Sequence, residues 1–309
     1  MAKKRKVDWH GVMTAVVTPF DAKGRIDEAA YKRNVDLCIG YGCTGIVPSG
    51  CGGESWALTT DEKKRVFKLS MDAAKGRVPV IAGTGGTSTA ESIELGEYAK
   101  SIGCDGAMIL APYFPKLADD DLYGHYKMIS DAVDMPIMVY NVPGYNPNEL
   151  KPELISRLAD LENVVAIKEA TTEFAKFHWT LRLAGDRIKV MTGQLSVYGV
   201  AAVSHGAVGA VTTVPQVWGA ESIEYYNLCV KGDTERAIQL ERKAVDLWHL
   251  YHDKGRTLYC SIKAGMNLQG LPGGYPRPPL RPILEPDLTE IRIGMEQMGF
   301  KIVSRAAAE

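Results

Sequence analysis

Long hydrophobic runs, paired-cysteine motifs and an excess charge of one sign are all missing from this sequence. Its 309 residues contain no uninterrupted apolar stretch of about 18 residues, so no segment is predicted to span a bilayer. The 36 basic and 37 acidic side chains nearly cancel, and a net charge of −1 gives no general attraction to polyanions. We therefore expect neither nucleic acid nor a membrane among its partners.

The cysteines and histidines are too dispersed to form a familiar ligand pattern. The absence of a CxxC spacing argues against a zinc site or a disulfide framework and favours free thiols in a reducing cytoplasm. The six histidines form no metal-type cluster, and His249 and His252, which share one predicted helical face, are expected at the surface. The six cysteines are Cys38, Cys43, Cys51, Cys104, Cys229 and Cys260.

A short basic run at residues 3–6 opens the chain, and no apolar segment follows it, which argues against a secretory signal. The run is similar to a short nuclear-import signal. Terminal basic residues before a first strand are common and easily tolerated, so a solvated tail over residues 1–9 is the preferred interpretation.

Apolar segments rich in Val and Ile alternate with helical patterns along most of the chain. This alternation is typical of βα units around a parallel sheet. Eight strands predict a (β/α)8 TIM barrel, an α/β fold, over residues 10–231. The predicted strands are residues 11–20, 45–49, 79–83, 106–111, 136–141, 164–169, 189–193 and 208–214.

The last part of the chain, residues 232–309, has helical periodicity and no strand pattern. Helices are predicted near 234–252, 258–268 and 287–298, with a rigid irregular connection over 271–282, where five prolines and two adjacent glycines interrupt the pattern. This predicts a C-terminal helical appendage on the barrel. An open doubly wound sheet is the competing architecture, and the lack of a G-x-G-x-x-G turn after the first strand argues against its dinucleotide-binding form.

Lys168 lies inside the predicted strand 164–169, where a charged residue is unusual. Barrel strands are buried on both faces, so this lysine loses hydration, which lowers its pKa and frees the amine as a nucleophile. Such an amine at the C-terminal end of a barrel strand suits Schiff-base formation with a carbonyl. An ion pair with Glu169 is the alternative, but neighbouring residues of a strand point to opposite faces.

Two further features fall at the C-terminal ends of predicted strands. Tyr140 ends the strand before that of Lys168, and its hydroxyl could move protons to and from a carbinolamine. The glycine-rich turn Gly50-Cys51-Gly52-Gly53 follows the second strand, and its backbone N–H groups could hold a carboxylate. A tyrosine at the barrel rim and a glycine turn are each common, so the prediction depends on their meeting Lys168 at one mouth.

At this point the chain resembles the dihydrodipicolinate synthase / N-acetylneuraminate lyase family of class I aldolases over nearly its whole length. The resemblance implies a TIM barrel, a homotetramer, and pyruvate or another 2-keto acid bound through the lysine, with no metal or organic cofactor. The matching segments are Thr18-Pro19-Phe20, the G-x-x-G-E turn at 50–54, and residues 82–85, 112–113, 140–143 and 167–170.

Carried over by position, the resemblance implies that Lys168 forms the Schiff base and that Tyr140 is the general acid and base. It implies that the turn at Gly50, Cys51 and Gly52 holds the keto-acid carboxylate. It also implies that the backbone near Gly209 lines the same pocket.

The departures from the family pattern concern proton transfer and the second substrate. Cys51-Gly52 replaces a pair of hydroxyl residues, and Phe114 stands where the family has a relay tyrosine contributed by the partner subunit. Tyr145 replaces an arginine that binds the aldehyde substrate's carboxylate in the synthase, a loss on the order of 2 kcal/mol or more. Residues 193–196 also lack the sugar-binding pattern of the sialic-acid lyases.

Three chemistries suit such a site. These are retro-aldol cleavage of a 2-keto-3-deoxy sugar acid, dehydration or deamination of such a compound, and hydratase-aldolase work on an arylidene-pyruvate with an aromatic aldehyde partner. Trp56, Phe114 and Tyr145 favour the third, because they make the distal pocket more apolar. Dihydrodipicolinate synthase activity, a non-catalytic keto-acid-binding protein and a phosphate-binding barrel enzyme without a Schiff base stay open as alternatives.

Overall fold

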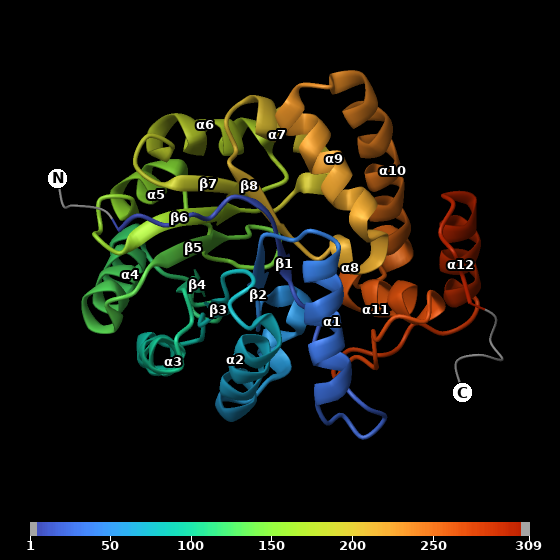
Figure 1. Cartoon of the computed structure of the whole chain (residues 1–309). Helices are drawn as coiled ribbons and strands as arrows, with labels where there is room; N and C mark the ends of the chain where they lie inside the picture. Colours follow the sequence, from blue (N-terminus) through green and yellow to red (C-terminus); the bar gives the residue numbers. More distant parts are fainter. Residues whose placement is uncertain (1–4, 304–309) are drawn as a thin grey trace.

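The computed structural model describes residues 5–303 and has the predicted (β/α)8 barrel with C-terminal helices (Figure 1). Eight parallel strands follow the order β2-β1-β8-β7-β6-β5-β4-β3, and a parallel bridge between Ile46 and Val80 joins the two ends of this sheet. The strands are β1 (Gly11–Ala15), β2 (Gly45–Val47), β3 (Ile81–Gly83), β4 (Gly106–Leu110), β5 (Ile137–Asn141), β6 (Val164–Glu169), β7 (Lys189–Thr192) and β8 (Gly209–Thr212).

Helices between and after these strands cover the outside of the barrel (Figure 1). They are α1 (Glu28–Gly40), α2 (Thr60–Ala74), α3 (Thr89–Ser101), α4 (Asp119–Val133), α5 (Pro152–Leu158), α6 (Phe174–Ala184), α7 (Leu195–Ser204), α8 (Pro215–Trp218) and α9 (Ala220–Lys231). Beyond the barrel follow α10 (Thr234–His252), α11 (Leu258–Leu268) and α12 (Asp287–Gln297). Two short 3-10 helices, η1 (Cys51–Gly53) and η2 (Ser55–Ala57), lie between β2 and α2, and η3 (Asp253–Gly255) follows α10.

Local sequence signals explain where α2 begins and ends. The Thr59 hydroxyl accepts from the Glu62 N–H at 3.2 Å, and the Glu62 carboxylate accepts from the Thr59 N–H at 2.9 Å. This reciprocal pair satisfies two N–H groups that the first helical turn leaves free. Lys75 and Gly76 then adopt positive φ angles of 50° and 70°, which ends the helix.

The eight predicted strands are confirmed; apart from β6 they are shorter than predicted, and the first differs most. β1 ends at Ala15, after which the chain stays buried but leaves the ladder. The Val17 N–H donates to the Gln216 side chain at 2.8 Å, and Phe20 bridges to Tyr275. A buried extended segment has the same apolar pattern as a strand, so periodicity alone did not separate the two.

Part of the predicted solvated tail is packed against the barrel instead. Trp9 is buried, and a Cβ at Gly106 would lie 2.4 Å from its ring. Arg5 Nε donates to the Asn163 side chain at 2.8 Å. The expectation of a free tail is therefore wrong at Trp9, because an indole gains more from burial than from water, whereas Arg5, Lys6 and Asp8 are exposed; residues 1–4 lie outside the described part.

The barrel interior forms a core separate from the larger one between strands and helices. Apolar side chains from several strands fill it, among them Met13, Val47, Ile81 and Met138. Among residues 5–303, no helix has the length and apolar character needed to cross a membrane.

Candidate active site

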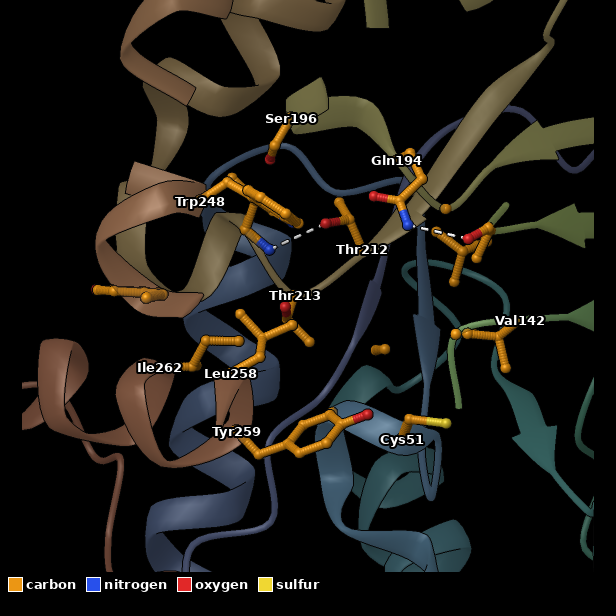
Figure 2. A pocket seen from close by; sticks show the side chains of 18 of the residues that line it. Cys51, Val142, Gln194, Ser196, Thr212, Thr213, Trp248, Leu258, Tyr259 and Ile262 are labelled. Carbon is orange, nitrogen blue, oxygen red and sulfur yellow. Dashed lines mark hydrogen bonds between the residues drawn. The ribbon is translucent and has the colours of Figure 1, made fainter. Parts of the chain in front are cut away.

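A cavity of about 290 Å³ lies at the carboxyl ends of the barrel strands (Figure 2). β5, β6 and β8 contribute Tyr140, Lys168 and Thr212 to its wall, and the turn after β2 contributes Cys51. The C-terminal helices cover the same mouth: in Figure 2, Trp248 of α10 and Tyr259 of α11 face the residues of the barrel. The cavity is thus assembled from the barrel rim and the appendage together.

Lys168 is a buried amine in this cavity, with 6% of its surface exposed. Burial lowers the pKa of its amine to about 8 from the usual 10.5, with a smaller opposing effect from Cys51. At pH 7, roughly a tenth of the amine is therefore neutral and nucleophilic.

Glu169 forms no ion pair with Lys168. This agrees with the expectation that neighbouring side chains of a strand point to opposite faces. Its carboxylate instead accepts from the Asn141 side chain at 2.9 Å and from the Thr171 N–H at 2.9 Å. Burial raises the pKa of Glu169 to about 7. Within residues 5–303 no carboxylate contributes to the pKa of Lys168, so the simpler interpretation as an ion pair is excluded.

Tyr140 pairs directly with Lys168 in the register between β5 and β6. The Lys168 Nζ lies 4.0 Å from the centre of the Tyr140 ring, so the two side chains are in contact. Burial raises the pKa of the Tyr140 hydroxyl well above its usual value, and the charge of Cys51 adds to this. Tyr140 is therefore a protonated hydroxyl at neutral pH.

The turn after β2 is held close to β8 and carries backbone strain. A Cβ at Gly52 would lie 2.2 Å from Thr213 Cγ2, so a larger residue would clash there. Ser49 and Glu54, on either side of the turn, both have positive φ angles, of 54° and 55°. Non-glycine residues adopt this conformation at a cost of about 1 kcal/mol or more, and such strain often clusters at binding sites.

The remaining residues of the turn differ in their relation to the cavity. Cys51 and Gly52 line it, and Gly50 lies behind them, buried between Ala15 and Met108. Cys51 is half-buried and has a free thiol in the cavity wall.

Two predicted site residues lie elsewhere. Phe114 is 87% exposed on the loop after β4 and does not line the cavity of this chain. Gly209 is the first residue of β8, at its amino end, where its backbone packs on Gly11. The expectation for Gly209 is corrected, because the cavity lies at the other end of the strand and Val211 and Thr212 line it.

Tyr145 lines the cavity as predicted, and an aromatic group surrounds it. Its ring centre lies 5.9 Å from that of Tyr259, and the Tyr259 ring lies 4.7 Å from that of Trp56. Trp56 does not line the cavity itself. It supports the wall from behind.

The sequence analysis missed the contribution of the C-terminal helices. Apolar side chains of α10 and α11, including Leu247, Trp248, Leu258 and Ile262, form one side of the cavity. The sequence of α11 contains a lysine, a serine and an asparagine among its apolar residues, so its pattern did not show that residues 259–266 are all buried.

His252 is a second correction, since it was expected at the surface. It lines the cavity and stacks on Trp248, with ring centres 4.2 Å apart. Burial lowers the pKa of His252, while its bond to the Trp248 carbonyl opposes this. The imidazole is therefore neutral at pH 7 and adds no fixed positive charge.

A buried lysine with no acidic partner among residues 5–303, beside a protonated tyrosine at the mouth of a (β/α)8 barrel, defines a class I, Schiff-base lyase that depends on pyruvate or a similar 2-keto acid. The sequence profile described as the Dihydrodipicolinate synthetase family matches residues 8–298. The chain belongs to this family, as its motifs indicated.

Individual relatives match over most of the chain. A 4-hydroxy-tetrahydrodipicolinate synthase of Phenylobacterium zucineum is 35% identical, and the match covers 94% of this chain and 98% of the relative. An uncharacterized DapA-like lyase of Rhizobium meliloti is 32% identical over 93% and 95%. Among solved structures, a prophage protein of the dihydrodipicolinic acid synthase family from E. coli K12, in complex with pyruvate, has a TM-score of 0.90, 26% identity and coverage of 96% and 100%.

Proposed function

We propose that Lys168 forms a Schiff base with pyruvate or a related 2-keto acid and that Tyr140 serves as the acid and base of the reaction. The observation that carries this proposal is the buried Lys168 amine, with its pKa near 8 and its Nζ against the Tyr140 ring. Both groups line one cavity, where a keto acid can reach them.

The first steps follow from this geometry. The neutral Lys168 Nζ adds to C2 of the keto acid as the C2–O π bond breaks, and Tyr140 donates its proton to that oxygen. Loss of water from the carbinolamine leaves an imine, which withdraws electrons from C3. Cleavage of the C3–C4 bond, or departure of a substituent from C4, then places the electron pair in an enamine.

The turn at Gly50, Cys51 and Gly52 is suited to the carboxylate of the keto acid. The first N–H groups of a helix lack partners within the helix, and η1 begins at Cys51. Cys51 and Gly52 line the cavity, so their backbone can approach a bound anion.

The second reactant is an uncharged carbonyl compound, and an aromatic or other apolar aldehyde fits best. The wall from α10 and α11 is apolar, and Tyr145 occupies the place of the family's arginine. Among the described residues that line the cavity, Lys168 and His252 are the basic ones; the first is consumed by the imine and the second is neutral. A second carboxylate would lose its charge-assisted contacts in such a wall.

Polar side chains among those that line the cavity support a second candidate, cleavage or dehydration of a 2-keto-3-deoxy sugar acid. These are Gln194, Ser196, Thr212 and Thr213, whose hydroxyl and amide groups are suited to bind the hydroxyls of a sugar chain. The Gln194 amide already donates to the Ala170 carbonyl at 2.9 Å, which leaves its oxygen to accept.

Dihydrodipicolinate synthesis is the runner-up. The names of several relatives favour it, since relatives at 34–36% identity are 4-hydroxy-tetrahydrodipicolinate synthases. Tyr145 argues against it, because a tyrosine cannot bind the carboxylate of aspartate semialdehyde as a guanidinium does.

The family resemblance also leads us to propose a homotetramer in the cytoplasm. All six cysteines are free, as a reducing compartment requires. A related solved structure is described as a monomeric variant, so the assembly of this chain needs its own measurement. Sedimentation at several concentrations would separate a tetramer from smaller forms.

The test of the proposed function is chemical trapping. Incubation with pyruvate and borohydride should add one reduced pyruvate to the intact protein, and peptide mapping should find it on Lys168. Pyruvate release from arylidene-pyruvates, from 2-keto-3-deoxy acids and, in the reverse direction, condensation with aspartate semialdehyde would then rank the three reactions. Absence of any adduct with a panel of 2-keto acids would exclude the Schiff-base proposal.

A further inference from the structure

Tyr259 brings a hydroxyl group into the cavity that the proposed mechanism leaves unused. Its side chain comes from α11, it is 7% exposed, and in Figure 2 its hydroxyl points toward Cys51. Trp56 and Tyr145 pack against its ring, which leaves the hydroxyl as the end that faces the cavity.

Cys51, Tyr140 and Tyr259 line the same cavity, and Cys51 and Tyr259 lie side by side in Figure 2. Burial raises the pKa of Tyr259, and its neighbours Cys51 and Tyr145 add to this. Burial also raises the pKa of Tyr140, and here too Cys51 and Tyr259 are the neighbours that add to the shift. The three side chains therefore form one contiguous group of exchangeable protons, with Tyr140 at the end nearest Lys168.

The position of Tyr259 is fixed by a second contact of α11 with the same turn. Lys263, one helical turn further on, forms a buried ion pair with Glu54, the last residue of the G-x-x-G-E motif. Its amine also donates to the Thr18 carbonyl at 2.8 Å and to the Tyr275 carbonyl at 2.7 Å. The helix and the turn are thus held together, and with them Tyr259 and Cys51.

We propose that Tyr259 is the outer member of a proton relay, Tyr259–Cys51–Tyr140, that lies within a single chain. The relay deepens the proposed function and rests on it, since it supplies protons to the acid and base of the Schiff-base reaction. It takes the place of the hydroxyl pair and the partner-subunit tyrosine that this sequence lacks at Cys51 and Phe114.

Proton balance in the relay is simple. When Tyr140 has given its proton to the leaving oxygen, its phenolate removes a proton from C3 of the imine, and the C3–H electrons form the enamine. The Tyr140 hydroxyl then exchanges its proton with the Cys51 thiol, which exchanges with Tyr259 and so with solvent. Each group accepts one proton and releases one, so no charge accumulates in the buried cluster.

The experiment uses pyruvate alone, so the second substrate need not be known. Exchange of the pyruvate methyl protons in D2O is followed by NMR, and imine formation is followed by borohydride trapping of the same protein. Tyr259→Phe keeps the ring and its contacts but removes the hydroxyl. We expect exchange to slow on the order of 10²-fold, with an unchanged yield of trapped adduct.

A second readout comes from combining substitutions, because groups that pass a proton in series give losses that do not multiply. Cys51→Ala should slow exchange to a similar extent, Cys51→Ser should restore most of it, and the double variant Tyr259→Phe/Cys51→Ala should be no slower than either single variant. Tyr226→Phe is the matched control: it removes a hydroxyl that donates to the Val208 carbonyl at 2.9 Å, outside the cavity, and should leave exchange unchanged.

The outcomes separate the two proposals. A wild-type protein that traps no keto acid would overturn the proposed function and the relay with it. Trapping in all variants with unchanged exchange in Tyr259→Phe would overturn the relay alone. Multiplying losses in the double variant, or loss of trapping in Tyr259→Phe, would assign Tyr259 to cavity packing and would also overturn the relay.

Discussion

Lys168 and Lys263 are both almost fully buried, but within the described part of the chain only Lys263 has an acidic partner. Lys263 touches Glu54 and two backbone carbonyls and lies over the Phe20 ring, whereas Lys168 has the Tyr140 ring beneath its amine. Burial lowers the pKa of both amines, and Glu54 opposes that shift at Lys263. The comparison teaches that burial alone does not make a lysine a nucleophile. The buried amine must also lack an acidic partner that stabilises its charged form.

The largest expected effect comes from removing the reactive amine. Lys168→Ala should abolish the pyruvate adduct and lower turnover roughly 10⁴- to 10⁶-fold, because the covalent step has no substitute. Intact-mass analysis after borohydride treatment measures the first effect, and pyruvate release measures the second. An adduct of unchanged yield in this variant would move the Schiff base to another lysine.

Removing the structural amine should damage folding rather than chemistry. Lys263→Met leaves Glu54 buried without its partner, and we expect a loss of about 3–5 kcal/mol in the free energy of unfolding. Denaturant titration measures this, and the folded fraction should still trap pyruvate on Lys168. The double variant Lys263→Met/Glu54→Gln should regain part of the stability, because no unpaired charge is left.

A smaller effect is expected where a glycine makes room for Lys168. A Cβ at Gly193 would lie 2.4 Å from Ala170 Cβ and 3.3 Å from Lys168 Cε. Gly193→Ala should therefore cost about 1–3 kcal/mol in stability and slow imine formation by displacing the amine. Gly124→Ala in α4 is the control, since a Cβ there meets nothing within 4 Å; equal behaviour of both variants would contradict the crowding argument.

The pH dependence should give the most gradual effect. The neutral amine is the reactive form, so imine formation should rise about tenfold per pH unit below the Lys168 pKa of about 8 and level off above it. If an acidic partner held the lysine charged, the rate of imine formation would keep rising with pH up to the usual lysine pKa of 10.5. Stopped-flow trapping between these limits distinguishes the two, and a plateau near 10 would mean that Lys168 is not desolvated.

The sequence predicted the elements of the barrel better than the walls of its site. The strand that carries Lys168 was found with its exact bounds, because its position in a buried strand leaves a strong local pattern. The strand that carries Gly209 was also found, but the end facing the mouth was not considered, although active sites of this fold lie at the C-terminal ends of strands.

The contacts that complete the site could not be obtained from local pattern. Tyr259 and His252 were visible in the sequence only as helical residues of the appendage, and nothing in their spacing indicates which part of the barrel they cover. Their placement depends on long-range packing, such as the bond between Lys263 and the Thr18 carbonyl, 245 positions apart. Local periodicity contains no information on such pairs.

The buried Trp9 has a consequence for kinetics. Together with Met13, Val47 and Met138 it belongs to the apolar core that fills the barrel beneath Lys168. Within residues 5–303, a substrate therefore reaches the amine from the carboxyl ends of the strands, where the cavity lies. With the proposed chemistry, a keto acid held at the bottom of a dead-end channel must enter before its partner. The aldehyde product must then depart before the keto acid is released, which gives a compulsory order that product-inhibition patterns would reveal.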